Sequence, residues 1–116
     1  MKIAVASEKN LVTEHFGHCQ NFNIFEVENN KIATKTSIDN PGHRPGFLPK
    51  YLASLGVNVV ISGGMGGGAI DLFREHNIQT ITGASGDAEK VVKDFLSGEL
   101  KSDNNICHEH KHYGEC

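Results

Sequence analysis

The sequence predicts an α/β fold with a mixed sheet of five strands, an antiparallel hairpin in its N-terminal part and helices on the sheet faces. Short apolar runs, which are typical of buried strands, recur along the chain. In the C-terminal half these runs alternate with amphipathic helical patterns, the order of parallel strands joined by right-handed helical crossovers. In the N-terminal half two strand patterns flank Asn29 and Asn30, so this part is predicted to be antiparallel.

The N-terminal strands follow from local patterns. Residues 2–6, "KIAVA", are apolar almost throughout and predict a strand that is buried on both faces. The segments 21–28 and 31–38 predict the two arms of a hairpin, because Asn29 and Asn30 tolerate the positive φ of a tight two-residue turn. The second arm alternates apolar and polar residues, which is the period of a half-buried strand.

The remaining elements alternate between helix and strand. After a loop rich in proline and glycine, a short helix is predicted to end at Gly56. Its apolar face consists of Leu48, Leu52 and Leu55. Two buried strands, at 57–62 and 78–82, are followed by helices at about 67–76 and 87–97, and the last helix carries a clear apolar stripe.

Composition and charge exclude several classes of protein. With 11 Lys and Arg against 14 Asp and Glu in 116 residues, the chain is mildly acidic and has no basic stripe for nucleic acid. Its apolar stretches are shorter than the roughly 20 residues that cross a bilayer. The apolar stretch at its N-terminus is too short for a secretory signal, because polar residues follow it closely. We therefore expect a soluble, cytoplasmic protein without a nucleic-acid or membrane partner. The hairpin edge could pair with a second copy, which leaves a homo-oligomer open.

Three loops follow the strands that are predicted to be parallel, at residues 7–20, 63–67 and 83–86. The carboxyl ends of parallel strands meet at one edge of the sheet, where ligands of open α/β folds bind. The predicted topology therefore brings "HFGHC" close to "GGMGGG".

The glycine run "GGMGGG" fits the dinucleotide pattern G-x-G-x-x-G/A only loosely, because no acidic residue ends the following strand to hold a ribose. It also lacks the Gly-Lys-Ser/Thr ending of a phosphate loop. One remaining interpretation is a tight strand–helix turn that needs positive φ. The other, which we favour, is the close approach of a ligand to the backbone, since five glycines are more than one turn requires.

Soft potential ligands lie next to this run in the predicted fold. Met65 offers a thioether, Cys19 a thiolate, and the two neighbouring histidines offer imidazoles, a set that selects thiophilic metal centres. An iron–sulfur or molybdenum–sulfur cluster also carries sulfides that accept N–H hydrogen bonds. A single crevice cysteine predicts loose, reversible binding by a carrier, not an electron-transfer protein. The alternatives are that Met65 packs under the loop and that His15 only forms hydrogen bonds within its loop.

The segments "MKIAVASE", "VTEHFGHCQNFNIFEVENN" and "VVISGGMGGGAIDLFREHNIQTITG" resemble the dinitrogenase iron–molybdenum cofactor biosynthesis family over about residues 1–100. The resemblance implies a ribonuclease-H-like three-layer fold that binds a metal–sulfur cluster or its precursor and passes it to a cluster-assembly or acceptor metalloprotein. The central strands lack the carboxylates of a two-metal nuclease, so no enzymatic activity is predicted. The predicted cofactor-binding residues are His15, Phe16, Gly17, His18, Cys19, Gly63, Gly64, Met65, Gly66 and Gly67.

Residues 101–116 are predicted to be a tail that is separate from the domain formed by residues 1–100. With His15, His18 and Cys19 of the crevice, the predicted metal ligands include the tail residues Cys107, His108, His110, His112 and Cys116. The tail could form a tetrahedral zinc site, lend thiolates to the crevice, or scavenge metal without a fixed structure. Two alternative functions therefore stay open: a mononuclear zinc or nickel buffer or sensor acting through the tail, and a phosphate- or nucleotide-binding module using the glycine loop.

Overall fold

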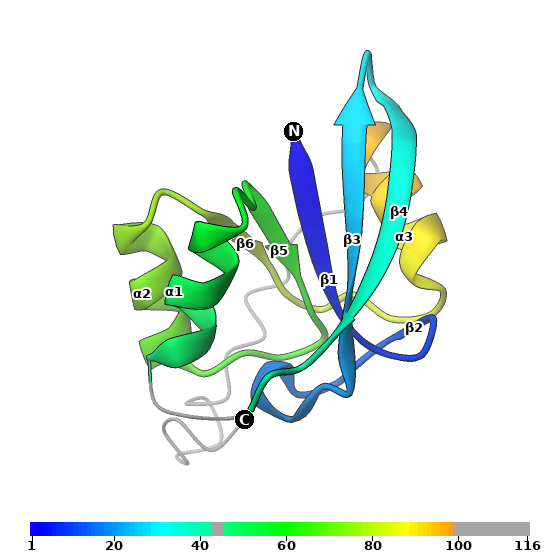
Figure 1. The fold of residues 1–116 in the computed structure, drawn as a ribbon. Coiled ribbons are helices and arrows are strands. Elements are labelled where there is room, and N and C mark those ends of the chain that lie inside the picture. The colour runs from blue at the N-terminus through cyan, green and yellow to red at the C-terminus, as the bar shows by residue number, and fades with distance from the viewer. Residues whose placement is uncertain (43–45, 99–116) are drawn as a thin grey trace.

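A computed structural model describes residues 1–42 and 46–98 of the chain. The elements of its N-terminal half are β1 (Lys2–Glu8), β2 (Leu11–Val12), the 3-10 helix η1 (Phe16–His18), β3 (Asn21–Glu28) and β4 (Lys31–Asp39). The elements of its C-terminal half are α1 (Phe47–Ser54), β5 (Val59–Ile61), α2 (Gly67–Glu75), β6 (Gln79–Ile81) and α3 (Ala88–Leu96). All five predicted strands and all three predicted helices are present (Figure 1).

The sheet is mixed, as predicted, with the strand order β4-β3-β1-β5-β6. Strands β1, β5 and β6 are parallel, whereas β3 is antiparallel to both β1 and β4. This order agrees with the ribonuclease-H-like fold that the family resemblance implied. A sixth strand, β2, pairs with the end of β1 and was not predicted, because two residues are too few to show a strand period.

The β3–β4 hairpin turns at Asn29 and Asn30, whose φ values of 52° and 64° confirm the predicted tight turn. The register between the two strands shifts once, at Glu26 and Val27, so β4 contains a bulge close to the turn. From Thr34 to Asp39 the pairing with β3 is regular.

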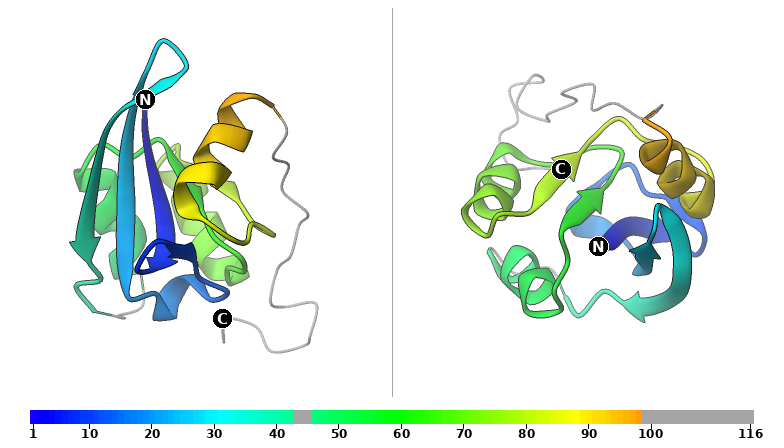
Figure 2. Two further views of the ribbon diagram at one scale, coloured as in Figure 1. Left: turned by 90° about the vertical axis from the view of Figure 1, so that its right-hand side faces the viewer. Right: turned by 90° about the horizontal axis from the view of Figure 1, so that it is seen from above.

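Two helical layers cover the sheet. Figures 1 and 2 show α1 and α2 on one face and α3 on the other. On β1, Ala4 and Ala6 belong to the core under α1 and α2. The alternate residues Ile3 and Val5 point the opposite way and belong to the core under α3. Alternation along one central strand thus supplies both cores, which confirms the prediction that this strand is buried on both faces.

The end of the first helix agrees with its predicted signal, and the start of the last helix has a side-chain cap that was not predicted. Helix α1 is followed by Gly56 at a φ of 82°, and α3 begins after Asp87, whose carboxylate accepts a hydrogen bond of 3.0 Å from the Lys90 amide. None of the three described helices has the length and apolar content that crossing a membrane would need.

Candidate functional site

The loops after β1, β5 and β6 meet at one edge of the sheet, as the parallel topology predicts. His15 and Gly64 form a parallel bridge, and the Phe16 amide donates to the Gly64 carbonyl at 3.0 Å. The Ser62 hydroxyl donates to the same carbonyl at 2.9 Å. Backbone hydrogen bonds therefore join the "HFGHC" segment to the start of the glycine run.

Gly63 lies where all three loops touch. Its amide donates to the Thr13 carbonyl at 2.8 Å, and its carbonyl accepts from the Gly83 amide at 2.7 Å. A Cβ at this position would lie 2.8 Å from the Thr13 oxygen and 2.9 Å from the Glu14 Cα. Close approach is thus the reason for this glycine, but the group that approaches is the protein's own backbone.

The remaining glycines of the run form the entry to α2. None of the glycines at 63, 64, 66, 67 and 68 has a positive φ, so the turn does not need the left-handed conformation that one interpretation of the run assumed. Gly66 is the N-cap and makes no side-chain cap, and its carbonyl accepts from the Ile70 amide at 3.1 Å. The amides of Gly67, Gly68 and Ala69 have no acceptor within the helix, so the positive end of α2 presents N–H donors.

Space is open beside this helix end. Gly68 is exposed, and a Cβ there would have no neighbour within 4 Å. The backbone amides at the start of a helix are a common place for an anion to bind.

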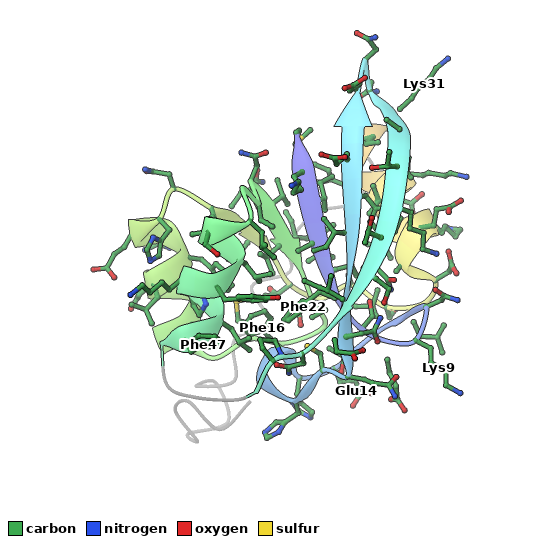
Figure 3. All side chains as sticks on the ribbon, viewed as in Figure 1. Lys9, Glu14, Phe16, Phe22, Lys31 and Phe47 are labelled. Atoms are coloured by element: carbon green, nitrogen blue, oxygen red, sulfur yellow. The ribbon has the colours of Figure 1, made fainter. Side chains whose placement is uncertain are left out.

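The two histidines of the crevice are exposed, whereas the two residues between them are buried. Phe16 packs edge-on against Phe73, with ring centroids 5.3 Å apart. It also packs against Phe22, with centroids 5.8 Å apart, and Figure 3 shows these two rings. This aromatic anchor fixes η1 to the core, so that His15 and His18 on either side lie at the surface.

Met65 is fully buried in the core that lies under α1 and α2. Its neighbours in that core include Phe16 and Phe73. The structure thus agrees with the alternative in which Met65 packs under the loop, and in this conformation its thioether does not reach the surface of the crevice.

Cys19 is also buried, with 4% of its surface exposed. The Asn40 amide group donates to the Cys19 carbonyl at 2.8 Å and lies 3.6 Å from its Sγ. Burial raises the pKa of the Cys19 thiol to about 12, and hydrogen bonds with the Ser7 backbone and the Asn40 side chain offset only part of the rise. In this conformation Cys19 is therefore a protonated, enclosed thiol at neutral pH and not the thiolate that the sequence suggested.

Within residues 1–42 and 46–98, no three His, Cys, Asp or Glu side chains converge in a way that could hold a metal ion. The predicted crevice ligands thus form no three-ligand group here. The predicted tail ligands Cys107, His108, His110, His112 and Cys116 lie outside the described residues.

Two residues that organise the site had no signal in the sequence. Ser62 directly follows strand β5, and Asn40 lies between Asp39 at the end of β4 and a proline. Serine and asparagine are common at such places, and their roles depend on contacts with segments that are distant in the chain.

Comparisons with known proteins support the fold and the family that the sequence motifs indicated. The family model described as "Dinitrogenase iron-molybdenum cofactor" matches residues 1–98. The uncharacterized protein MJ0580 of Methanocaldococcus jannaschii is 33% identical over 106 residues, which cover 87% of this chain and 90% of that protein. The crystal structure of PH0822 superposes with a TM-score of 0.83 at 29% identity, covering 90% of this chain and 96% of that one. The apo form of the orange protein of Desulfovibrio gigas shares the fold, with a TM-score of 0.76 at 20% identity over 90% of this chain and 93% of that chain.

Proposed function

Because this chain belongs to the dinitrogenase iron–molybdenum cofactor family, we propose that it binds a metal–sulfur cluster or a cluster precursor and delivers it to another metalloprotein. The cluster is cargo, so the protein acts as a carrier and not as an enzyme. The binding place is the edge of the sheet where the loops after β1 and β5 meet. The recipient is a cluster-assembly or acceptor protein.

One observation carries this proposal: the bridge between His15 and Gly64 joins the segment that carries two exposed histidines to the glycine run that leads into α2. The two parts bind different portions of a cluster. Imidazole nitrogen coordinates iron and other thiophilic metals, whereas backbone amides donate hydrogen bonds to sulfides.

The start of α2 suits a bulky anion. Its first amides have no acceptor within the helix, and the helix dipole adds partial positive charge at the same place. Gly68 in the first turn is exposed, and a Cβ there would have no neighbour within 4 Å among the described residues. A sulfide-rich cluster with net negative charge fits both the charge and the donors.

The buried sulfurs support reversible binding. Permanent iron–sulfur sites hold their clusters with about four thiolates. Here Cys19 is protonated and enclosed and Met65 is in the core, so neither sulfur is available as a ligand in this conformation. The ligands in this proposal are therefore imidazoles and backbone amides. Ligands of this kind exchange more readily than a full set of thiolates, which is what a carrier needs.

The test is anaerobic reconstitution of the full chain with iron, molybdate and sulfide, followed by metal and acid-labile sulfide analysis and an absorption spectrum. The first variant is His15→Ala with His18→Ala, and the matched control is His76→Ala, an exposed histidine after the far end of α2. The second variant is Gly68→Asp, which places a carboxylate at the first turn of α2. An acidic residue there favours the helix but repels an anionic ligand, so it separates binding from folding.

We expect the double histidine variant and Gly68→Asp each to lose most of the bound cluster, while His76→Ala retains it. Unchanged stoichiometry and spectrum in both crevice variants would refute the proposal. A version cut after Lys101 separates the alternatives. Zinc or nickel without sulfide, lost on truncation, would identify a tail-based metal buffer, and heat from a titration with nucleotides would favour a phosphate-binding module.

A further inference from the structure

Strand β4 is an edge strand of the sheet formed by the described residues. It is the last strand in the sheet order, paired only with β3 among the described strands, and Figure 2 shows it at the rim of the sheet. Residues 33–37 are exposed. We propose that two copies of this chain associate through this edge, with the two β4 strands antiparallel and related by a two-fold axis at Ser37.

The backbone groups that face outward follow from the ladder. The Asn40 amide donates to the Gln20 carbonyl at 3.1 Å, so the backbone of residue 40 faces β3. In an antiparallel ladder, successive residues point their amide and carbonyl groups alternately toward and away from the partner strand. The pairing is regular back to Thr34, so Lys35, Ser37 and Asp39 present their amides and carbonyls at the free edge.

A two-fold axis at Ser37 pairs these outward-facing residues with one another. Ser37 lies opposite Ser37 of the second copy, and each Lys35 lies opposite an Asp39 of the other copy. The dimer therefore gains backbone hydrogen bonds at three successive outward positions and two symmetric cross-strand ion pairs. Thr36 lies opposite Ile38, so the partly buried Ile38 gains cover.

Charge selects this register over its neighbours. An axis at Lys35 would place two lysines opposite each other, and an axis at Asp39 would place two carboxylates opposite each other, both of which destabilise a sheet. An axis at Thr36 would place Lys35 of one copy opposite Ser37 of the other, so no ion pair would form there. It would also place Asp39 opposite the bulged part of β4 in the other copy. Only the axis at Ser37 places Lys35 opposite Asp39 within the regular segment.

Both charges are available for this pairing. Lys35 Nζ lies 5.8 Å from the centre of the Phe25 ring and 3.3 Å from Asn10 Oδ1, and among the described residues neither Lys35 nor Asp39 forms an ion pair. A lysine on an edge strand normally discourages pairing. Here Lys35 disfavours the register that would place it opposite a second lysine, and it favours the register that places it opposite the Asp39 carboxylate.

The extent of the contact predicts its strength. The bulge near Ala33 and the proline at position 41 limit regular pairing to about five residues of each copy. Such a short ladder buries less than a permanent dimer interface, so association should be weak and should depend on protein concentration. The inference does not depend on the cluster, because β4 lies outside the proposed binding residues.

The test is sedimentation velocity of the full chain over a wide concentration range, with reductant present to exclude disulfide-linked species. The variants are Lys35→Asp, Asp39→Lys and the double swap, and Lys31→Asp is the control for charge because it lies beyond the bulge. Each single variant replaces two ion pairs by two like-charge pairs and should weaken dimerisation roughly tenfold. The double swap should restore it, and Lys31→Asp should leave it unchanged.

Amide hydrogen exchange gives a second readout that needs no variant. The amides of Lys35, Ser37 and Asp39 should exchange more slowly as the protein concentration rises, whereas those of Thr36 and Ile38, already directed at β3, should not change. A monomer at every concentration, equal weakening by Lys31→Asp, or a double swap that folds but fails to recover dimerisation would each overturn the proposal.

Discussion

Replacing Gly63 by alanine tests the finding that this glycine serves the protein's own backbone. The added Cβ would stand 2.8 Å from the Thr13 oxygen and 2.9 Å from the Glu14 Cα, closer than such atoms approach in proteins. Both neighbours are backbone atoms, so they cannot move aside as a side-chain end could. Overpacking costs about 1–3 kcal/mol, and a less flexible unfolded chain returns about 0.5 kcal/mol. We therefore expect Gly63→Ala to lower the free energy of unfolding by about 1.5 kcal/mol.

Gly68→Ala is the matched control, because it makes the same chemical change in the same glycine run. A Cβ at Gly68 meets nothing within 4 Å, and alanine favours a helix, so this variant should be about 0.5 kcal/mol more stable than the wild type. Urea unfolding followed by circular dichroism measures both. Equal stability of the two variants, or a Gly63→Ala protein within about 0.5 kcal/mol of the wild type, would refute the reasoning.

The two buried sulfurs give the remaining predictions. Met65→Ala should lower the free energy of unfolding, measured by urea titration, by about 2–5 kcal/mol. Met65→Leu keeps the volume, so it should lower the free energy of unfolding by less than about 1.5 kcal/mol and leave cluster loading unchanged. Loss of loading in a folded Met65→Leu protein would instead identify the thioether as a ligand. In a Cys107→Ser/Cys116→Ser background, Cys19 should react with a thiol reagent much more slowly in the native than in the unfolded chain, and fast native labelling would contradict its enclosure. Burial raises the pKa of the Cys19 thiol from an ordinary 9.0 to about 12, so as the pH rises the unfolded chain loses this proton before the folded protein does. The stability that the buried thiol contributes is therefore complete below pH 9.0 and should be lost as the pH rises toward 12.

The sequence predicted the sheet well because its signals are local. The apolar run at 2–6, the paired asparagines of the hairpin and the stripe of the last helix each reflect a backbone period or a turn preference that neighbouring residues determine. Strand β2 gave no such signal, because its two residues are held by pairing with the end of β1.

The candidate site was predicted in part. Parallel strands joined by helices leave their following loops at one edge, so the meeting of His15 with Gly64 followed from topology. The availability of Met65 and Cys19 did not follow, because the sequence shows that a sulfur is present but not which way it points. Both sulfurs are turned into the core in this structure.

The sequence by itself determined the class of fold, the edge of the sheet where the motif-bearing loops meet and the family to which the chain belongs. Periodicity, turn chemistry and motif residues are properties of short segments, and short segments can be read directly. Only the tertiary structure decided that Gly63 accommodates a neighbouring loop, that two sulfurs are enclosed and that Lys35, Ser37 and Asp39 present their backbone groups at the outer edge of β4. Burial, close approach and strand register are set by pairing between segments that are distant in the chain, so no local pattern encodes them.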